Sequence, residues 1–204
     1  SMPVRAEDGI RLRSFLLSPD GELLGVQDQL CPPPGYAPGR AIAPIPSALG
    51  RVGIVIERDA EVPEIGRILA LQGADLYCVP AALPAPYNPW RQAAGMWQIV
   101  QANQVAAVEA CLVGEMAGRL YAGSSRLLGA VETTSDGTGV IAAAASAGQT
   151  EVVTGTIDLD AQAGARASFP IFASFHRDLY KMLPRAYRIL TSACGAAEKE
   201  GMPS

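Results

Sequence analysis

The first apolar positions of the chain form two short runs on either side of a turn. Residues 12–17 and 22–24 are rich in apolar side chains, and Asp20-Gly21 lies between them. An Asp-Gly pair in this setting favours a β-hairpin, because both turn residues tolerate positive φ angles. The pattern therefore predicts an antiparallel hairpin near the start of the chain.

The clearest pattern is a strand, a helix and a second strand. Residues 52–56 are an uninterrupted apolar run, which is typical of a strand buried on both faces. Pro63 suits the first turn of a helix and Gly73 suits its end. A further apolar run at residues 75–79 completes the unit and predicts two parallel strands. Ligands bind beyond the carboxyl ends of such strands, where Glu57 lies.

The rest of the chain is less regular. Its predicted elements are proline-rich loops at 31–46 and 84–89, a helix at 90–103, and strands at 105–113, 125–131, 140–145 and 151–159, with Asp136-Gly137 as a second hairpin turn. Residues 169–190 mix apolar and basic side chains, and we expect them to pack back on the domain or on a second subunit. The tail after Cys194 is expected to fray.

Composition favours one domain that binds neither nucleic acid nor membrane. The chain has 204 residues, of which 49% are hydrophobic and 18% charged. This predicts a single domain over residues 1–204, with a core at about 11–190 and a frayed tail at 191–204. The net charge of -4 includes no basic cluster, and no apolar run approaches the roughly 18 residues of a membrane span.

The cysteines do not suggest a metal centre. The four cysteines are widely spaced without a Cys-x-x-Cys pair, and the chain has a single histidine, His176. We therefore expect no metal, no cofactor, and buried free thiols in a reducing cytoplasm. Glycine-rich motifs that hold phosphates are also missing from the sequence.

Several short motifs follow one another in a specific order. They are Gly50-Arg51-Val52-Gly53-Ile54-Val55-Ile56-Glu57-Arg58-Asp59, Val62-Pro63-Glu64, Arg67, Gly73-Ala74-Asp75, Val79-Pro80, the helix from Trp97 to Gln104, Gly123-Ser124-Ser125, Ile157-Asp158-Leu159-Asp160 with Arg166, and His176-Arg177-Asp178-Leu179-Tyr180. This order resembles the nitrilase, or carbon-nitrogen hydrolase, family over most of the chain. The resemblance implies an α/β fold, a four-layer α-β-β-α sandwich that here lacks its N-terminal elements, and usually a dimer.

The same resemblance implies hydrolysis of amides or nitriles by a Cys-Glu-Lys triad. A thiolate attacks carbon, a glutamate transfers the proton, and a lysine stabilises the developing negative charge. Glu57 stands at the family's nucleophile position, and either Gln27 or Asp28 stands at the lysine position. The triad glutamate belongs to a part of the family domain before the first hairpin. We therefore expect all three triad members to be missing or replaced.

Glu57 has two roles open to it. As a nucleophile it would form an anhydride through an adduct that simply expels the carboxylate again, so the chemistry disfavours nucleophilic catalysis. It can act as a general base for water, with Arg58 stabilising an oxyanion, if burial raises its pKa. Alternatively, it lies at a helix N-terminus and pairs with Arg58, Arg67 or a backbone amide.

Other nucleophiles have less support in the sequence. Cys78 lies one strand away from Glu57, but a thiol on an apolar strand is usually an inert core residue. Ser124 lacks the Gly-x-Ser-x-Gly elbow, and His176 lies in the final segment, so a Ser-His-Asp triad is not indicated.

These observations lead to one main hypothesis and one alternative. The main hypothesis is a catalytically inactive structural, regulatory or small-molecule-binding homologue, whose ligand pocket beyond Glu57 is lined by Asp28, Leu83 and the two proline-rich loops. The alternative is an enzyme that hydrolyses non-peptide carbon-nitrogen bonds of a small amide or nitrile, with Glu57 as general base. In either case we expect a homodimer or a second chain to cover the exposed sheet edge.

Overall fold

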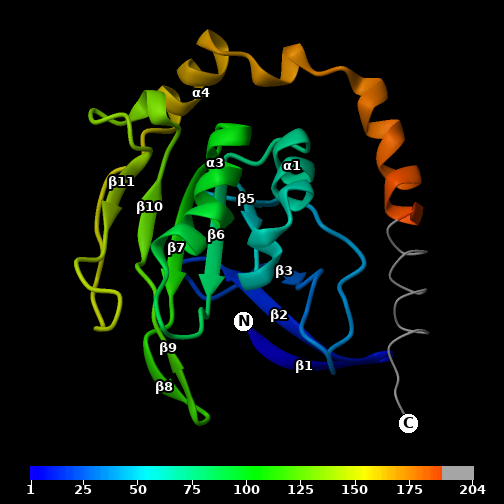
Figure 1. Ribbon diagram of the computed structural model, residues 1–204, viewed down its shortest axis with the longest axis vertical. Helices are drawn as coiled ribbons and strands as arrows, with labels where there is room; N and C mark the ends of the chain where they lie inside the picture. Colours follow the sequence, from blue (N-terminus) through cyan, green and yellow to red (C-terminus); the bar gives the residue numbers. More distant parts are fainter. Residues whose placement is uncertain (190–204) are drawn as a thin grey trace. The chain divides into compact units, whose positions relative to one another are not determined.

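The computed structural model describes residues 1–189, which divide into two compact units, residues 1–169 and residues from 170 onward (Figure 1). The first unit contains a six-stranded sheet in the order β11-β10-β7-β6-β5-β4 and a three-stranded sheet in the order β1-β2-β3. The strands of the larger sheet are β4 (Ile45–Ser47), β5 (Gly50–Ile54), β6 (Leu76–Ala81), β7 (Ala106–Cys111), β10 (Arg126–Leu128) and β11 (Val140–Ala143). The other strands are β1 (Met2–Ala6), β2 (Gly9–Leu17), β3 (Leu23–Asp28) and the separate hairpin β8 (Gly114–Met116) and β9 (Arg119–Tyr121).

The strand-helix-strand unit predicted from the sequence is confirmed. Strands β5, β6 and β7 are parallel neighbours, and helix α1 (Pro63–Leu71) connects β5 with β6. Helix α1 begins at Pro63. The N–H groups of the first turn have no acceptor within a helix, so a proline, which lacks the N–H, loses no hydrogen bond there. It ends one residue before Gln72, and Gly73 then takes the positive φ of 83° that a glycine tolerates.

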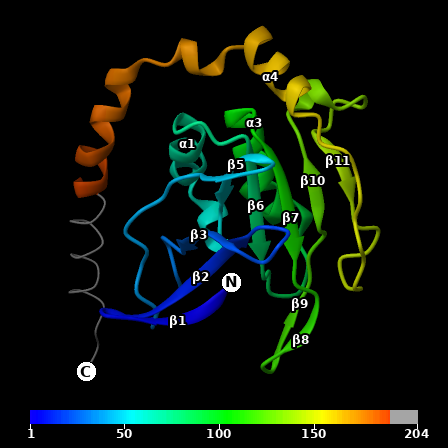
Figure 2. The same cartoon turned by 180° about the vertical axis from the view of Figure 1, so that it is seen from behind.

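The two faces of the larger sheet bury different layers. Tyr77 of β6 points toward α1, where its hydroxyl donates a 2.7 Å hydrogen bond to the carbonyl of Gly66. Helix α3 (Gln98–Asn103) packs beside α1 on this face. On the other face, Leu16 of β2 packs against the buried Ile54 and Ile56, which places the three-stranded sheet there (Figure 2). The first unit is therefore built from a helical layer and two sheets.

The N-terminal hairpin is also confirmed, with one strand more than predicted. Strands β2 and β3 pair in antiparallel fashion around the Asp20-Gly21 turn. Strand β1 pairs with β2 from Met2 onward, ahead of the first predicted strand. Sequence patterning missed β1 and the β8–β9 hairpin because both are too short to show a period.

Two predicted elements differ from the structure. The predicted strand at 151–159 forms no ladder; instead the carboxylate of Asp158 caps helix α4 (Leu159–Ser168) by accepting a 2.8 Å bond from Ala161 N–H. The predicted helix at 90–103 is interrupted, because Gly95 has a ψ of -112° between α2 (Pro89–Gln92) and α3. Gly95 lies against Ala60, whose carbonyl oxygen would be 3.6 Å from a Cβ at this position.

The second unit is described up to residue 189. It contains two 3₁₀ turns, Ile171–Ser174 and Arg177–Met182, followed by a helical stretch at 183–189. The rings of Phe172, Phe175 and Tyr180 pack edge to face, with centroids 5.7 and 5.9 Å apart. The expected packing of this segment on the domain or a second subunit stays a prediction, and Cys194 and the predicted tail lie outside the described residues. No helix among residues 1–189 is long and apolar enough to cross a membrane.

Candidate functional site

Glu57 lies at a sharp turn where the chain leaves the larger sheet. After β5, Val55 N–H still donates to the carbonyl of Cys78 at 3.0 Å, and Glu57 then opens the 3₁₀ turn Glu57–Glu61. Its φ of 46° is left-handed, a conformation that is unfavourable for a residue with a Cβ. Such strain persists only where the surrounding structure imposes it, and it is frequent at functional sites.

Hydrogen bonds between this turn and the loop after β3 fix its position. The amide of Gln29 donates a 3.1 Å bond to the carbonyl of Ile56. The buried carboxylate of Asp59 accepts bonds from Leu30 N–H at 3.0 Å and Cys31 N–H at 2.8 Å. Burial raises the pKa of Asp59, and these two backbone bonds oppose that effect. The residues on both sides of Glu57 are thereby held in place.

The turn opens into a cavity of about 410 Å³, within the range of small-molecule sites. Its lining residues are Pro33, Glu57, Arg58, Ala60, Glu61, Val79, Ala81, Ala82, Leu83, Pro84, Arg91, Gln92, Gly95, Met96, Glu109, Arg119 and Tyr121. Three of the residues proposed from the sequence therefore meet here: Glu57, Arg58 and Leu83. Both proline-rich loops contribute, through Pro33 and Pro84.

Asp28, the fourth proposed site residue, does not line this cavity. Its carboxylate accepts bonds of 2.6 and 3.0 Å from Arg13 and of 3.1 Å from Arg11, and the hydrogen bonds from Arg13 and Arg11 lower its pKa. Side chains alternate along a strand, so Asp28 and Gln27 of β3 point to opposite faces. Gln27 is buried and donates to the carbonyl of Ala41 at 3.0 Å, and it does not reach the cavity either.

Glu57 faces the cavity with its carboxylate free. Within residues 1–189 it makes no hydrogen bond or ion pair, so the predicted pairing with Arg58, Arg67 or a backbone amide is not seen. Burial raises the pKa of Glu57 above its ordinary value of 4.5, and the positive charge of the exposed Arg58 only partly opposes this. A half-buried carboxyl of this kind can accept a proton or a hydrogen-bond donor from a ligand.

Sequence reasoning missed a second carboxylate in the cavity, Glu109 of β7. Its Oε2 accepts three hydrogen bonds, at 2.8 and 2.6 Å from Nε and Nη2 of Arg126 and at 2.8 Å from Nε2 of Gln92. Glu109 and Arg126 are opposite each other in the antiparallel pair β7–β10, and Gln92 ends α2. The one feature of the sequence that could have indicated Glu109 as a site residue is that it is a charged side chain within the apolar run Ala106–Cys111.

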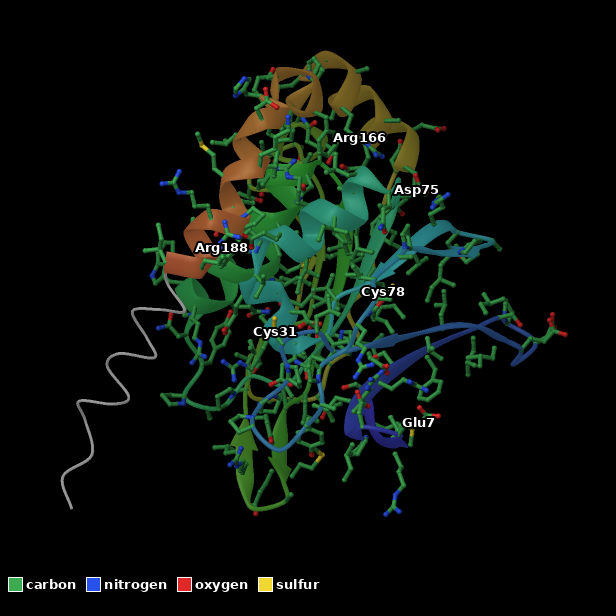
Figure 3. The ribbon with its side chains drawn as sticks, turned by 90° about the vertical axis from the view of Figure 1, so that its right-hand side faces the viewer. Glu7, Cys31, Asp75, Cys78, Arg166 and Arg188 are labelled. Carbon is green, nitrogen blue, oxygen red and sulfur yellow. The ribbon has the colours of Figure 1, made fainter. Side chains whose placement is uncertain are left out.

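The three described cysteines do not line the cavity. Cys78 faces the space between the two sheets together with Ser14 and Leu16, and burial raises the pKa of its thiol. Cys111 contacts Nε2 of Gln92 at 3.4 Å, and burial raises its pKa to about 12. Cys31, expected to be buried, is exposed on the proline-rich loop; Cys31 and Cys78 can be followed in Figure 3.

A metal or a histidine triad finds no support in the described part of the chain. Residues 1–189 contain no cluster of histidine, cysteine and acidic side chains that is suited to a metal ion. His176 lies in the second unit, whereas Ser124 is in the first unit and its hydroxyl donates to the carbonyl of Ala144 at 3.3 Å. Ser124 therefore has a structural partner of its own.

The sequence profile of carbon-nitrogen hydrolases matches residues 2–167, which is most of the chain. The chain belongs to the carbon-nitrogen hydrolase family. A comparison with curated protein sequences gives no match.

Solved structures of carbon-nitrogen hydrolases share the fold. A carbon-nitrogen hydrolase from Helicobacter pylori G27 is 21% identical with a TM-score of 0.74, over 88% of this chain and 67% of that one. Nit3 of Saccharomyces cerevisiae, a nitrilase-superfamily member, is 19% identical with a TM-score of 0.69, over 86% and 64%. A double mutant of the amidase from Nesterenkonia sp. AN1, in complex with acrylamide, is 23% identical with a TM-score of 0.61, over 78% and 60%. The chain thus has a nitrilase-like α/β fold and spans about two thirds or less of the length of these relatives.

Proposed function

We propose that this chain is a small-molecule-binding member of the carbon-nitrogen hydrolase family that does not carry out the family's thiol chemistry. The main support is the identity of the residue at the turn after β5. The resemblance in sequence places the family's nucleophile at Glu57, and a mutant of the similar amidase from Nesterenkonia sp. AN1 shows covalent addition of the acetamide moiety of fluoroacetamide at its active-site cysteine. Here a carboxylate faces the cavity instead.

The chemistry of the cavity lining agrees with this proposal. No residue that lines the cavity is a cysteine or a lysine, and the only lysines of the sequence are Lys181 and Lys199. A carboxylate that attacked an amide would be expelled from the tetrahedral adduct in preference to the amine. A partly apolar cavity with a strained residue in its lining retains what binding requires.

A second candidate function rests on the state of Glu57. Its carboxylate is free, its pKa is raised by burial, and Arg58 lines the same cavity. This combination suits a general base that deprotonates water for attack on a small amide or nitrile, with an arginine near the developing oxyanion. Such an enzyme would gain activity as the pH rises through the pKa of Glu57.

Assembly with another chain or a second copy is part of the proposal. Phe15 and Val26 are opposite each other on β2 and β3, and both side chains are exposed, by 41% and 40%. Leu17 and Leu23 extend this apolar patch along the same two strands. Exposed apolar patches of this kind mark interaction surfaces. Light scattering coupled to size exclusion should give a dimer or larger species, and a monomer at all concentrations would argue against the assembly.

The two functions are separated by measuring binding and turnover together. Ammonia release is followed for a panel of small amides and nitriles at high protein concentration, and thermal shifts are recorded for the same compounds and for small amines, carboxylates and amino acids. Wild type, Glu57→Ala and the control Glu22→Ala, an exposed turn residue, are compared. We expect thermal shifts that Glu57→Ala abolishes and no ammonia release. Turnover that depends on Glu57 would establish the hydrolase, and the absence of any shift would refute the binding function.

A further inference from the structure

Glu109 is a buried carboxylate with one oxygen left for a ligand. Its side chain is 4% exposed and lines the cavity. The three hydrogen bonds from Arg126 and Gln92 all go to Oε2. Oε1 accepts none within the described part of the chain, and it is not enclosed either. Oε1 is therefore open to the cavity, where it can accept a hydrogen bond from a donor group of a ligand.

Glu57 and Glu109 come from the two strands on either side of β6, and both line the cavity. Glu57 follows β5 and Glu109 lies on β7, with β6 between them, where Val79 is paired with Glu109. Neighbouring strands are about 4.8 Å apart, so strands β5 and β7 lie roughly 10 Å apart. Glu57 follows the end of β5, and both glutamate side chains line the same cavity, so a small polar group of a ligand in the cavity can lie between them.

The charges at the floor and at the mouth of the cavity have opposite sign. At the floor, Glu57 and Glu109 carry two carboxylates against one arginine, Arg126, which leaves the floor negative. At the mouth, Arg58, Arg91 and Arg119 are all exposed, with Glu61 as the one acidic lining residue. Among residues 1–189, Arg91 is the one of these three arginines that forms an ion pair, with Glu61 at 3.4 Å.

The walls between floor and mouth are apolar. Val79 and Ala81 of β6 contribute, together with Leu83 and the buried Met96. These side chains offer no hydrogen bonds, so they suit a hydrocarbon chain and disfavour a charged group.

From this arrangement we propose that the cavity takes a zwitterionic ligand with a cationic nitrogen group between Glu57 and Glu109, a short hydrocarbon middle, and a carboxylate at Arg119 and Arg58. The inference rests on the proposed binding function and names the class of its ligand. An amine or amidine donates to two carboxylates at the floor, and the carboxylate of the same molecule pairs with an arginine at the mouth. Electrostatic complementarity of this kind also fixes the orientation of the bound ligand, with its cationic end at the floor and its carboxylate at the mouth.

The test uses matched probes that differ only in charge. Dissociation constants are measured by titration calorimetry for 4-aminobutyrate, butylamine, butyrate and butyramide, and 6-aminohexanoate extends the series in length. We expect one of the two amino acids to bind about threefold to fivefold more tightly than butylamine, and butyrate to bind most weakly, since one partly exposed ion pair contributes a factor of this size.

Two variants assign the ends of the ligand. Arg119→Gln should weaken the amino acids about threefold to fivefold and leave butylamine unchanged, whereas Glu57→Gln should weaken every cationic probe. Arg5→Gln is the control, because Arg5 is exposed on β1 and does not line the cavity. Binding of butyrate or butyramide with equal or higher affinity than the amino acids would overturn the zwitterion and leave the binding function standing. Absence of binding by all probes would refute both.

Discussion

Replacing Arg126 by methionine should destabilise the protein in a way that depends on pH. The guanidinium is 9% exposed and Glu109 is 4% exposed, so neither charge is screened by water. Arg126 supplies two of the three hydrogen bonds to Oε2 of Glu109, and only the bond from Gln92 remains in Arg126→Met. Removing one partner of a buried ion pair costs about 3–5 kcal/mol, because the other charge stays buried without compensation.

The pH dependence follows from the direction of the pKa shift. Burial raises the pKa of Glu109 above its ordinary value of 4.5, and Arg126 opposes this, so the variant raises it further. The folded state then binds a proton more tightly than the unfolded state. The loss of stability is present above the raised pKa and disappears as the pH falls through that pKa toward 4.5.

Urea unfolding at pH 5 and pH 8 measures this effect. The free energy of unfolding of Arg126→Met should fall by about 3–5 kcal/mol at pH 8 and by clearly less at pH 5. The double variant Glu109→Gln/Arg126→Met should recover much of the lost stability at pH 8. Its free energy of unfolding should not change with the titration of residue 109, because glutamine has no proton to gain. A loss below about 1 kcal/mol, or an equal loss at both pH values, would refute the assignment of Glu109 as a buried ionised partner of Arg126.

Three further predictions concern the turn at Glu57 and the packing of α1. Because Glu57 has a φ of 46°, Glu57→Gly should be more stable than Glu57→Ala by about 1 kcal/mol in urea unfolding, and equal stability would contradict a strained turn. Burial raises the pKa of Glu57 above 4.5, so ionised Glu57 destabilises the fold as the pH rises through that pKa. Glu57→Gln should therefore melt at a higher temperature than wild type at pH 7.5 and at the same temperature at pH 4. A difference in melting temperature that is the same at both pH values would contradict the raised pKa. A Cβ at Gly66 would collide with the Cγ2 of Ile99, so Gly66→Ala should cost about 1–3 kcal/mol. Gly164→Ala in α4, where a Cβ meets nothing, should instead stabilise by up to about 1 kcal/mol, and similar effects of the two changes would show that α1 and α3 do not touch at Gly66.

The sequence predicted the part of the site that local patterns determine. The apolar run at 52–56 and the helix start at Pro63 are short-range signals, and together they placed Glu57 at the carboxyl end of β5. Arg58, which follows Glu57, and Leu83, which was expected in a pocket beyond Glu57, also line the cavity.

The remaining parts of the site depend on contacts that are distant in sequence. Gln92, Glu109 and Arg126 meet only because β7 and β10 pair in one register and α2 ends beside them. Asp28 was assigned to the cavity, yet its pairing with Arg13 across β2 and β3 turns it away. A one-residue difference in a strand changes the face, and the hydrophobic pattern of β3 is too weak to decide it.

The predicted strand at 151–159 failed for a related reason. A run of β-branched residues indicates an extended backbone, but a strand also needs a partner with free hydrogen-bonding groups. Here β11 is the last strand of the sheet, and the segment passes close to it, with Gly155 near Ala142, without forming a ladder.

Ligand-observed NMR on one sample tests the central claim most directly, because it detects binding and turnover together. Small amides and the amino acid probes are incubated with the protein for several days, with Glu57→Gln in a parallel tube. The proposed function predicts saturation transfer to the probes with wild type, its loss in Glu57→Gln, and no product signals in either tube. Product that accumulates with wild type alone, or probes that receive no saturation from it, would contradict a binding protein built around Glu57.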